Sequence, residues 1–168
     1  MTEQQWLNIY RDTVHPLYGY MAKRTGGNRE LTEDIVQESY LRALDNWKRK
    51  TLPESPVAWL KRVARNILID YLRQKRWDNK EDLERHSDSS NQASRDQFKS
   101  LEIFLAISSL GKKKAKILEA FYYDGMSVRE IAHSMTISER AVEGQLRRAR
   151  QSLKSLLPEL NPNGGKND

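Results

Sequence analysis

The sequence predicts an all-α protein made of two small helical domains joined by a flexible linker, the C-terminal one a helix-turn-helix. Three observations predict this fold. Apolar residues recur at steps of three and four along most of the chain, which is typical of amphipathic helices. A polar stretch at 78–94 divides the chain, because it has too few apolar residues to form a core. Ser127 and Ser138 are N-capping residues that mark two successive helix starts.

The bulk properties restrict the function classes. The 168 residues suit one ordinary domain or two small ones. A net charge of +6 and a pI of about 9.5 favour a polyanionic partner, either nucleic acid or a membrane surface. No apolar run is long enough to cross a bilayer, and the N-terminus does not resemble a signal peptide, so we expect a cytoplasmic protein without membrane insertion.

Metal and cofactor sites are not expected. Cysteine is absent, which excludes disulfides and thiolate zinc sites. The three histidines, His15, His86 and His133, are scattered without the spacing of metal ligands. Nothing in the sequence resembles a phosphate-binding glycine loop, so we expect neither a cofactor nor catalytic residues.

Three helices are expected in the first half, over about 2–24, 28–47 and 56–77. Pro16 lies inside the first and should kink or locally break it. Ser55 followed by Pro56 is a typical helix start, because serine caps the first turn and proline suits its first residue. Four aromatic residues are candidate stacking partners for bases, although a core position is favoured for the second and third: Trp47, Trp59, Tyr71 and Trp77.

The second half begins after the linker, in which Leu83 is the only large apolar residue. Two helices are expected over about 98–110 and 112–124, separated by Gly111. The second of them should direct four residues inward: Ile117, Leu118, Phe121 and Tyr122. The predicted domains are therefore 1–77 and 95–160, with the linker at 78–94 and a disordered tail at 161–168.

The helix-turn-helix is predicted from Ser127 to Lys154. Ser127 followed by Glu130 is a capping box, Thr136 and Ile137 form the turn, and Ser138 caps the second helix. The apolar stripe of this helix consists of Val142, Leu146, Ala149, Leu153 and Leu156. Its opposite face is mainly basic and consists of Arg140, Glu143, Gly144, Arg147, Arg148, Gln151 and Lys154. This pattern indicates a DNA-reading helix; an ordinary helical hairpin with a solvated basic face is the alternative.

Three stretches resemble blocks of bacterial sigma factors, in the same order. LTEDIVQESYLRALDNW resembles the region that binds the clamp of core RNA polymerase, and SPVAWLKRVARNILIDYLRQKR resembles the helix that melts and reads the −10 element. YYDGMSVREIAHSMTISERAVEGQLRRARQSL resembles the −35-reading helix-turn-helix. A short linker replaces the central domain of larger sigma factors. By this resemblance, the chain is identified as a member of the extracytoplasmic-function (group 4) sigma factors of the sigma-70 family.

The resemblance implies three sets of functional residues. Contacts to the polymerase clamp fall on Asp34, Gln37, Glu38 and Leu41. Contacts to the −10 strand and its backbone, together with the loop from Trp47 to Ser55, fall on Lys48, Arg49, Arg62, Arg65, Asn66, Arg73, Lys75 and Arg76. Contacts to the −35 major groove fall on Ser138, Arg140, Ala141, Gly144, Arg147 and Arg148. The implied partners are core RNA polymerase, promoter DNA and an anti-sigma factor.

One departure and two alternatives remain. The family usually has a Leu-Pro pair where this chain has Leu110-Gly111, which is expected to loosen the start of the following helix. A transcriptional regulator with a LuxR-like helix-turn-helix is the main alternative, although the N-terminal half shows no βαβ alternation. An enzyme acting on nucleic acid would need clustered carboxylates, and Asp34 with Glu38 has no evident third ligand.

Overall fold

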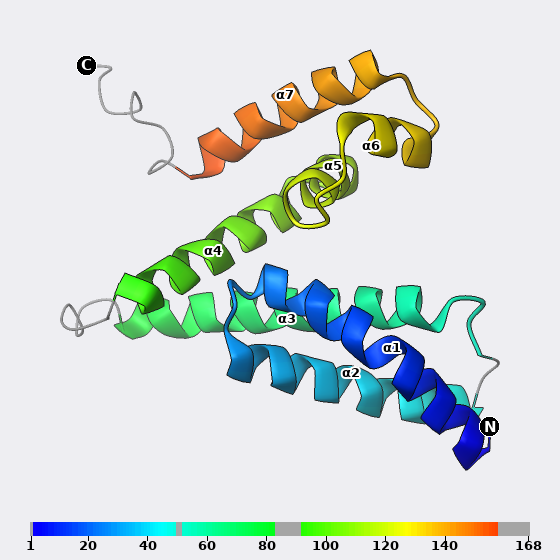
Figure 1. Cartoon of the computed structure of the whole chain (residues 1–168). Helices are drawn as coiled ribbons and strands as arrows, with labels where there is room; N and C mark the ends of the chain where they lie inside the picture. The colour runs from blue at the N-terminus through cyan, green and yellow to red at the C-terminus, as the bar shows by residue number, and fades with distance from the viewer. Residues whose placement is uncertain (1, 50–51, 83–91, 158–168) are drawn as a thin grey trace, which may run out of the picture. The chain divides into compact units, whose positions relative to one another are not determined.

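The computed structural model of the chain describes residues 2–49, 52–82 and 92–157, and the side chains of residues 49 and 76–82 lie outside this description. Within these ranges the chain forms helices and no strand, which confirms the all-α fold class (Figure 1). The helices are α1 (Glu3–Arg24), α2 (Arg29–Arg49), α3 (Pro56–Asp82), α4 (Gln92–Ser109), α5 (Lys112–Tyr122), α6 (Val128–Met135) and α7 (Glu139–Leu156). The chain divides into two compact units, Met1–Leu101 and Glu102–Asp168.

Helix α1 begins with a capping box that the sequence analysis had not identified. Thr2 Oγ1 accepts a hydrogen bond from the backbone N of Gln5 at 3.2 Å, and Gln5 Oε1 accepts one from the backbone N of Thr2 at 2.9 Å. Pro16 was expected to kink or locally break the helix. The helix instead runs without a break through Pro16 to Arg24, so the expected break is wrong, and the kink stays a prediction. Leu17 and Met21, which follow the proline, are fully buried, and their packing keeps the helix continuous despite the missing backbone hydrogen bond.

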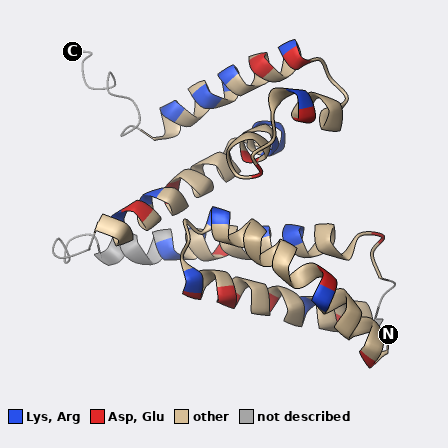
Figure 2. Cartoon of the chain, in the orientation of Figure 1, with Lys and Arg blue, Asp and Glu red and all other residues tan. Residues whose placement is uncertain are grey.

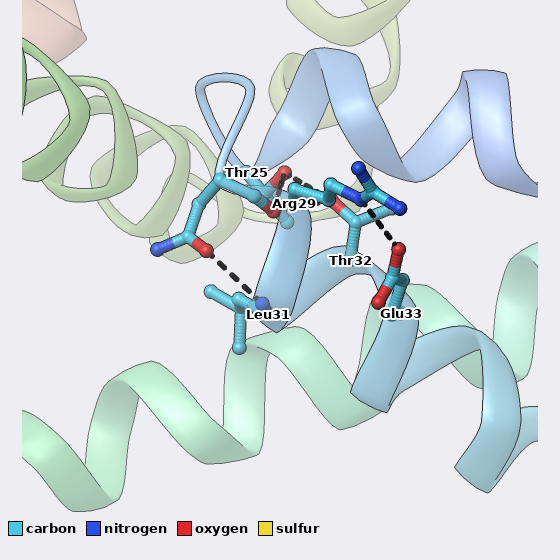
Figure 3. Close-up of polar contacts among 6 residues, drawn as sticks. Thr25, Arg29, Leu31, Thr32 and Glu33 are labelled. Atoms are coloured by element: carbon cyan, nitrogen blue, oxygen red, sulfur yellow. Dashed lines mark hydrogen bonds and ion pairs between the residues drawn. The ribbon is translucent and has the colours of Figure 1, made fainter.

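The turn between α1 and α2 is closed by side chains (Figure 3). The hydroxyls of Thr25 and Thr32 are both buried and lie 2.7 Å apart in a hydrogen bond. Asn28 Oδ1 accepts a hydrogen bond from the backbone N of Leu31 at 3.0 Å and so caps the start of α2. The bond to Asn28 satisfies a backbone amide that the start of α2 would otherwise leave unpaired, and the bond between the two threonines joins the end of α1 to the first turn of α2.

The first unit contains a three-helix core. Helices α1, α2 and α3 contact one another in all three pairs, and they lie side by side in Figure 1. The buried apolar residues of these helices are Leu17, Met21, Leu31, Ile35, Val36, Tyr40, Ala43, Trp47, Leu60, Ala64, Leu68, Ile69 and Leu72. Helix α3 begins at Pro56 as predicted, and Ser55 Oγ accepts a long hydrogen bond from the backbone N of Ala58 at 3.4 Å.

The ends of the predicted linker are helical. Helix α3 continues to Asp82 and α4 already begins at Gln92, whereas the linker was expected to span 78–94. Residues 83–91 and the predicted tail at 161–168 lie outside the described residues. A helix can extend past the core where its residues have good helix propensity, as Lys80 and Glu81 do, because its hydrogen bonds are internal. The low apolar content of the segment therefore did not predict where the helices end.

The start of α4 belongs to the first unit, whose boundary falls at Leu101 within this helix. Gly26 in the α1–α2 turn has a φ of 63°, which L side chains rarely adopt. A Cβ at Gly26 would also lie 2.8 Å from the Cβ of Ser100. Both the backbone conformation and the available space therefore require glycine at this position.

The second unit packs α5, α6 and α7 around one core. Its buried residues are Ile107, Ala115, Ile117, Leu118, Ile131, Ala132, Val142, Leu146, Ala149 and Leu153. Two residues expected in this core are instead exposed, Tyr122 at 54% and Leu156 at 49%. Leu156 follows Leu153, the last buried residue of α7, and Tyr122 ends α5 with its hydroxyl in a hydrogen bond to Arg150.

The helix-turn-helix has the predicted caps. Ser127 Oγ accepts a hydrogen bond from the backbone N of Glu130 at 3.2 Å, and the Glu130 carboxylate accepts one from the backbone N of Ser127 at 2.7 Å. Thr136 ends α6 in the left-handed conformation, with φ 55° and ψ 46°. Ser138 Oγ then accepts a hydrogen bond from the backbone N of Ala141 at 3.2 Å. The turn therefore joins the two helices through the two residues that the sequence predicted.

Candidate functional site

The four residues expected to contact polymerase lie on the outer side of α2. Asp34 and Gln37 are exposed, Glu38 is partly exposed and Leu41 is 62% exposed. Their spacing of three and four residues places them along one helix face. The Glu38 carboxylate forms an ion pair with Arg42 at 2.7 Å. Leu41 is an apolar side chain that is exposed to water beside two carboxylates. Its burial would be favourable if another protein covered this face.

Three of the residues expected to contact the −10 strand share one face of α3. Arg62, Asn66 and Arg73 are exposed, and steps of four and seven residues place them on the side opposite the core. Arg65 is half-buried. None of Arg62, Arg65 and Asn66 is packed inside the unit, as a DNA-binding role requires.

The remaining −10 candidates occupy other positions. Lys75 is exposed, but it follows Arg73 by two residues, about 200° around the helix, so it cannot share the face of Arg62 and Asn66. Lys48 is exposed within α2, which continues to Arg49 instead of ending at Trp47. The side chains of Arg49 and Arg76 lie outside the described residues.

The aromatic candidates differ in their exposure. Trp47 is only 2% exposed, so it packs in the core and presents no free ring face to a base. Trp59 is half-buried against it, with the two ring centroids 5.1 Å apart. Tyr71, for which a core position was favoured, is 39% exposed, and Lys75 Nζ lies 5.8 Å from its ring centroid. Trp77 lies outside the side chains that the structure describes.

Helix α7 presents a basic outer face. Blue bands of lysine and arginine recur along it in Figure 2. Its core side is formed by Val142, Leu146, Ala149 and Leu153. The predicted −35 residues lie on other sides: Ser138, Arg140, Arg147 and Arg148 are exposed, and Ala141 and Gly144 are half-buried. Arginines at the start of an exposed helix are suited to guanine edges and phosphates in a major groove.

Gly144 lies beside the guanidinium of Arg148, one turn further along α7. A Cβ built at Gly144 would be 3.5 Å from Arg148 Nη1 and 3.9 Å from Nη2, which is ordinary van der Waals contact. The arginine side chain therefore lies back along the helix over the glycine. Arg148 therefore does not itself require glycine at position 144, and the missing side chain leaves room for another group to approach this part of α7.

Comparisons with known proteins match each half of the chain to a family model. The family model described as Sigma-70 region 2 matches residues 9–78, which cover most of α1, all of α2 and most of α3. The model described as Sigma-70, region 4 matches residues 100–153, from late α4 into α7. The order of the two matches is the order of the blocks in the sequence.

Curated relatives match along most of the chain. The chain is 31% identical to the ECF RNA polymerase sigma factor SigL of Mycobacterium tuberculosis, over 90% of this chain and 88% of the relative. It is 29% identical to the ECF RNA polymerase sigma factor SigM of Bacillus subtilis, over 88% of this chain and 92% of the relative. It is also 30% identical to the uncharacterized protein R00370 of Rhizobium meliloti, over 89% of this chain but 38% of that longer protein.

The chain belongs to the extracytoplasmic-function sigma factors of the sigma-70 family. Its function is therefore that of an RNA polymerase sigma factor, and the match of the first half to region 2 disfavours the LuxR-like alternative. Gly111, where the family usually has proline, precedes α5 without a side-chain cap, yet the sigma factor starts this helix at Lys112. The backbone N of Ala115 donates to the Gly111 carbonyl at 3.0 Å, so the first helical hydrogen bond is present.

Tyr40 has a shifted pKa, which its buried position in the first unit explains. Burial raises the pKa of Tyr40, whose hydroxyl lies 2.7 Å from Thr13 Oγ1 inside the first unit.

Among the described residues, no group of three or more metal-ligating side chains occurs. No described helix is both long enough and apolar enough to span a membrane.

Sequence reasoning missed one basic residue of α7. Arg150 was not assigned to any face, but its Nε donates a hydrogen bond to the hydroxyl of Tyr122 at 2.8 Å. The sequence did contain a signal for it, because Arg150 lies three residues after Arg147 and four before Lys154, a spacing that places the three on one helix face. The assignment of Tyr122 to the core hid this contact, because a tyrosine with an inward ring would not have been paired with a surface arginine.

Proposed function

We propose that this sigma factor divides promoter recognition between its two units. In this proposal α2 binds the clamp of core RNA polymerase, α3 holds the opened −10 non-template strand, and α7 reads the −35 duplex. The predicted domains correspond to these roles, with 1–77 as the region 2-like domain and 95–160 as the region 4-like domain. The cytoplasm, where RNA polymerase acts, is the proposed location, and an anti-sigma factor is the proposed regulator.

The α2 face supports the polymerase role. Asp34 and Glu38 carry negative charge, which DNA phosphates would repel, so a protein partner suits this surface. The exposed Leu41 adds an apolar contact to the same face. A charged rim around an exposed apolar side chain is a common composition for a protein interface.

The α3 face supports the −10 role. Arg62 and Arg73 provide positive charge for the backbone of a single strand, and Asn66 provides both a donor and an acceptor for a base edge. Strand opening costs stacking energy, so a melting module must hold the extruded strand by such contacts. This assignment rests on one observation, which is that Arg62, Asn66 and Arg73 are all exposed on the same side of α3.

The α7 face supports the −35 role. Arg140, Arg147 and Arg148 are exposed on the second helix of a helix-turn-helix, which is the helix that enters the major groove in this motif. Two separate DNA-binding surfaces on one chain also raise each other's local concentration at a bipartite promoter. In this proposal, the tether therefore lets each unit bind with a modest affinity of its own.

Run-off transcription tests the proposal. The purified full chain is combined with core RNA polymerase and genomic fragments, and the expected result is a set of discrete transcripts that require the added chain. The matched control is core polymerase alone on the same templates. Transcripts that are identical with and without the chain would refute the proposed function.

A further inference from the structure

Arg150 is held in place by two aromatic residues of α5. Its Nε donates to Tyr122 Oη at 2.8 Å, and its guanidinium carbon lies 5.2 Å from the ring centroid of Phe121 and 5.6 Å from that of Tyr122. The two rings pack edge to face, with centroids 5.1 Å apart. Both ring distances fall within the range of cation–π attraction. The planar guanidinium is therefore oriented before any ligand arrives.

The hydrogen bond to Tyr122 uses only one edge of the guanidinium. The two terminal amino groups carry four further N–H donors in a fixed plane, a geometry that matches two oxygens of a phosphate or a carboxylate. Arg150 is half-buried and Tyr122 is 54% exposed, so solvent reaches the pair. Among the residues that the structure describes, Arg150 forms no ion pair with a carboxylate.

The neighbours of Arg150 favour DNA over a protein carboxylate. Arg147 and Lys154 are exposed and lie one turn before and one turn after it, so three cations follow one flank of α7. Two exposed acids, Glu139 and Glu143, lie on the same flank, both before Arg147 and nearer the start of the helix, so the cations gather toward its C-terminal end. The three Cα positions are separated by about 4.5 and 6 Å along the helix axis, a scale comparable to the charge spacing along a DNA strand. A single acidic side chain would engage only one of these cations.

We propose that Arg150 binds a backbone phosphate beside the −35 groove and that Tyr122 is a positioning residue that holds its guanidinium. This inference rests on the proposed function and extends the −35 surface from α7 to the end of α5. Arg150 supplies affinity without sequence information, whereas the start of α7 supplies base contacts. The ligand is thus the phosphodiester backbone of double-stranded DNA.

The test measures binding of the holoenzyme to one promoter duplex recovered by run-off transcription, over a series of salt concentrations. The variants are Arg150→Gln, Arg150→Lys and Tyr122→Phe, and Arg11→Gln, an exposed arginine of α1, is the matched control. Arg150→Gln is expected to weaken binding about tenfold, as for the loss of one charge-assisted hydrogen bond. It should also reduce the slope of log K against log salt by about one. Arg11→Gln should change neither.

A double-mutant cycle tests the positioning role. Tyr122→Phe keeps both rings and all charges, so it should retain the salt slope and weaken binding by roughly threefold, less than the loss of the whole phosphate contact. In the Arg150→Gln background, Tyr122→Phe should have no further effect, because its role acts through the arginine. If the pair served only the fold, both single variants would lose thermal stability, while Arg150→Gln would keep both the promoter affinity and the salt slope of the wild type.

Three outcomes would overturn the inference. The first is an unchanged salt slope for a folded Arg150→Gln protein. The second is a weaker affinity of this variant for core polymerase with unchanged DNA binding, which would indicate that Arg150 binds a protein carboxylate. If Arg150→Gln fails to fold, the third outcome is a promoter affinity of Tyr122→Phe equal to that of the wild type. Promoter-specific transcripts from the wild-type chain keep the proposed function intact in each case, whereas their absence would refute that function itself.

Discussion

Trp47 in α2 packs against Trp59 in α3 with their ring centroids 5.1 Å apart and their planes inclined by 57°. Trp6 of α1 also contacts Trp47, at 5.9 Å between centroids. Trp6, Trp47 and Trp59 therefore form one aromatic cluster that joins α1, α2 and α3. This cluster fixes both ends of the segment that precedes the proposed −10 face.

Replacing Trp47 with alanine should strongly destabilise the first unit. Trp47 is almost fully buried, and removal of a buried tryptophan side chain leaves a cavity that costs about 3–5 kcal/mol. The half-buried Trp59→Ala should cost less. Chemical denaturation followed by circular dichroism measures both values. A loss of less than about 1 kcal/mol for Trp47→Ala would contradict the packing described for this cluster.

Thr136→Gly should stabilise the second unit. Thr136 adopts φ 55°, a conformation that is costly for a β-branched residue and free of that cost for glycine. The expected gain in unfolding free energy is about 0.5–1 kcal/mol after the entropy of glycine is included. Thr25→Gly provides the matched control, because Thr25 ends α1 with a negative φ and a buried hydrogen bond to Thr32, so it should destabilise. Thermal unfolding that ranks the two variants in the opposite order would refute this interpretation.

Glu130 should titrate below its ordinary value. Hydrogen bonds from the side chain and backbone of Ser127 favour its carboxylate and lower its pKa from 4.5. The capping box therefore contributes stability above pH 4.5, and this contribution is lost as the pH falls through the lower folded pKa. Carboxyl NMR titration should show a pKa closer to 4.5 in Ser127→Ala. Equal values in the two proteins would mean that the capping box does not form in solution.

Gly144→Ala should separate stability from DNA binding. Alanine has the higher helix propensity by about 1 kcal/mol, and a Cβ at this position makes only ordinary contact with Arg148. The melting temperature should therefore rise, while affinity for the −35 duplex falls because the methyl group occupies the closest approach to the groove. Calorimetry and duplex binding together check this. Higher stability with unchanged promoter affinity would remove Gly144 from the proposed interface.

Leu41→Ser should weaken polymerase binding without affecting the fold. Leu41 is 62% exposed in the free chain, so its removal costs little packing. Burial of a leucine in an interface contributes about 1.5–3 kcal/mol, which predicts at least a tenfold loss of affinity for core polymerase. Leu7→Ser, at a residue 44% exposed on α1, is the control and should retain affinity. Equal affinities of Leu41→Ser and the wild type would exclude this face from the clamp contact.

The sequence predicted the local features that short-range chemistry determines. The serine caps at 127 and 138 and the turn between them follow from side chains that bond the nearest backbone amides. The core of α7 follows from the spacing of its apolar residues. The faces assigned by resemblance also avoid the core, because a basic or acidic residue cannot be buried without a partner.

The remaining features depend on packing that periodicity does not encode. Tyr71 and Tyr122 fit apolar stripes, yet each is exposed, since a tyrosine ring can cover a surface while its hydroxyl bonds to water or, in Tyr122, to Arg150. Helix α1 continues through Pro16 because Leu17 and Met21, which follow the proline, are buried in the core. The contact between Arg150 and Tyr122 joins residues 28 apart in sequence, so it appears only once α5 and α7 are placed together.

Site-specific crosslinking in the open promoter complex tests the division of labour most directly. A photoreactive amino acid is placed at Asn66 in one protein and at Arg140 in another, and the crosslinked nucleotides are mapped on each strand. The account predicts that position 66 crosslinks to the −10 non-template strand and position 140 to the −35 duplex. Crosslinks from both positions to one element, or from position 66 to the −35 duplex, would contradict it.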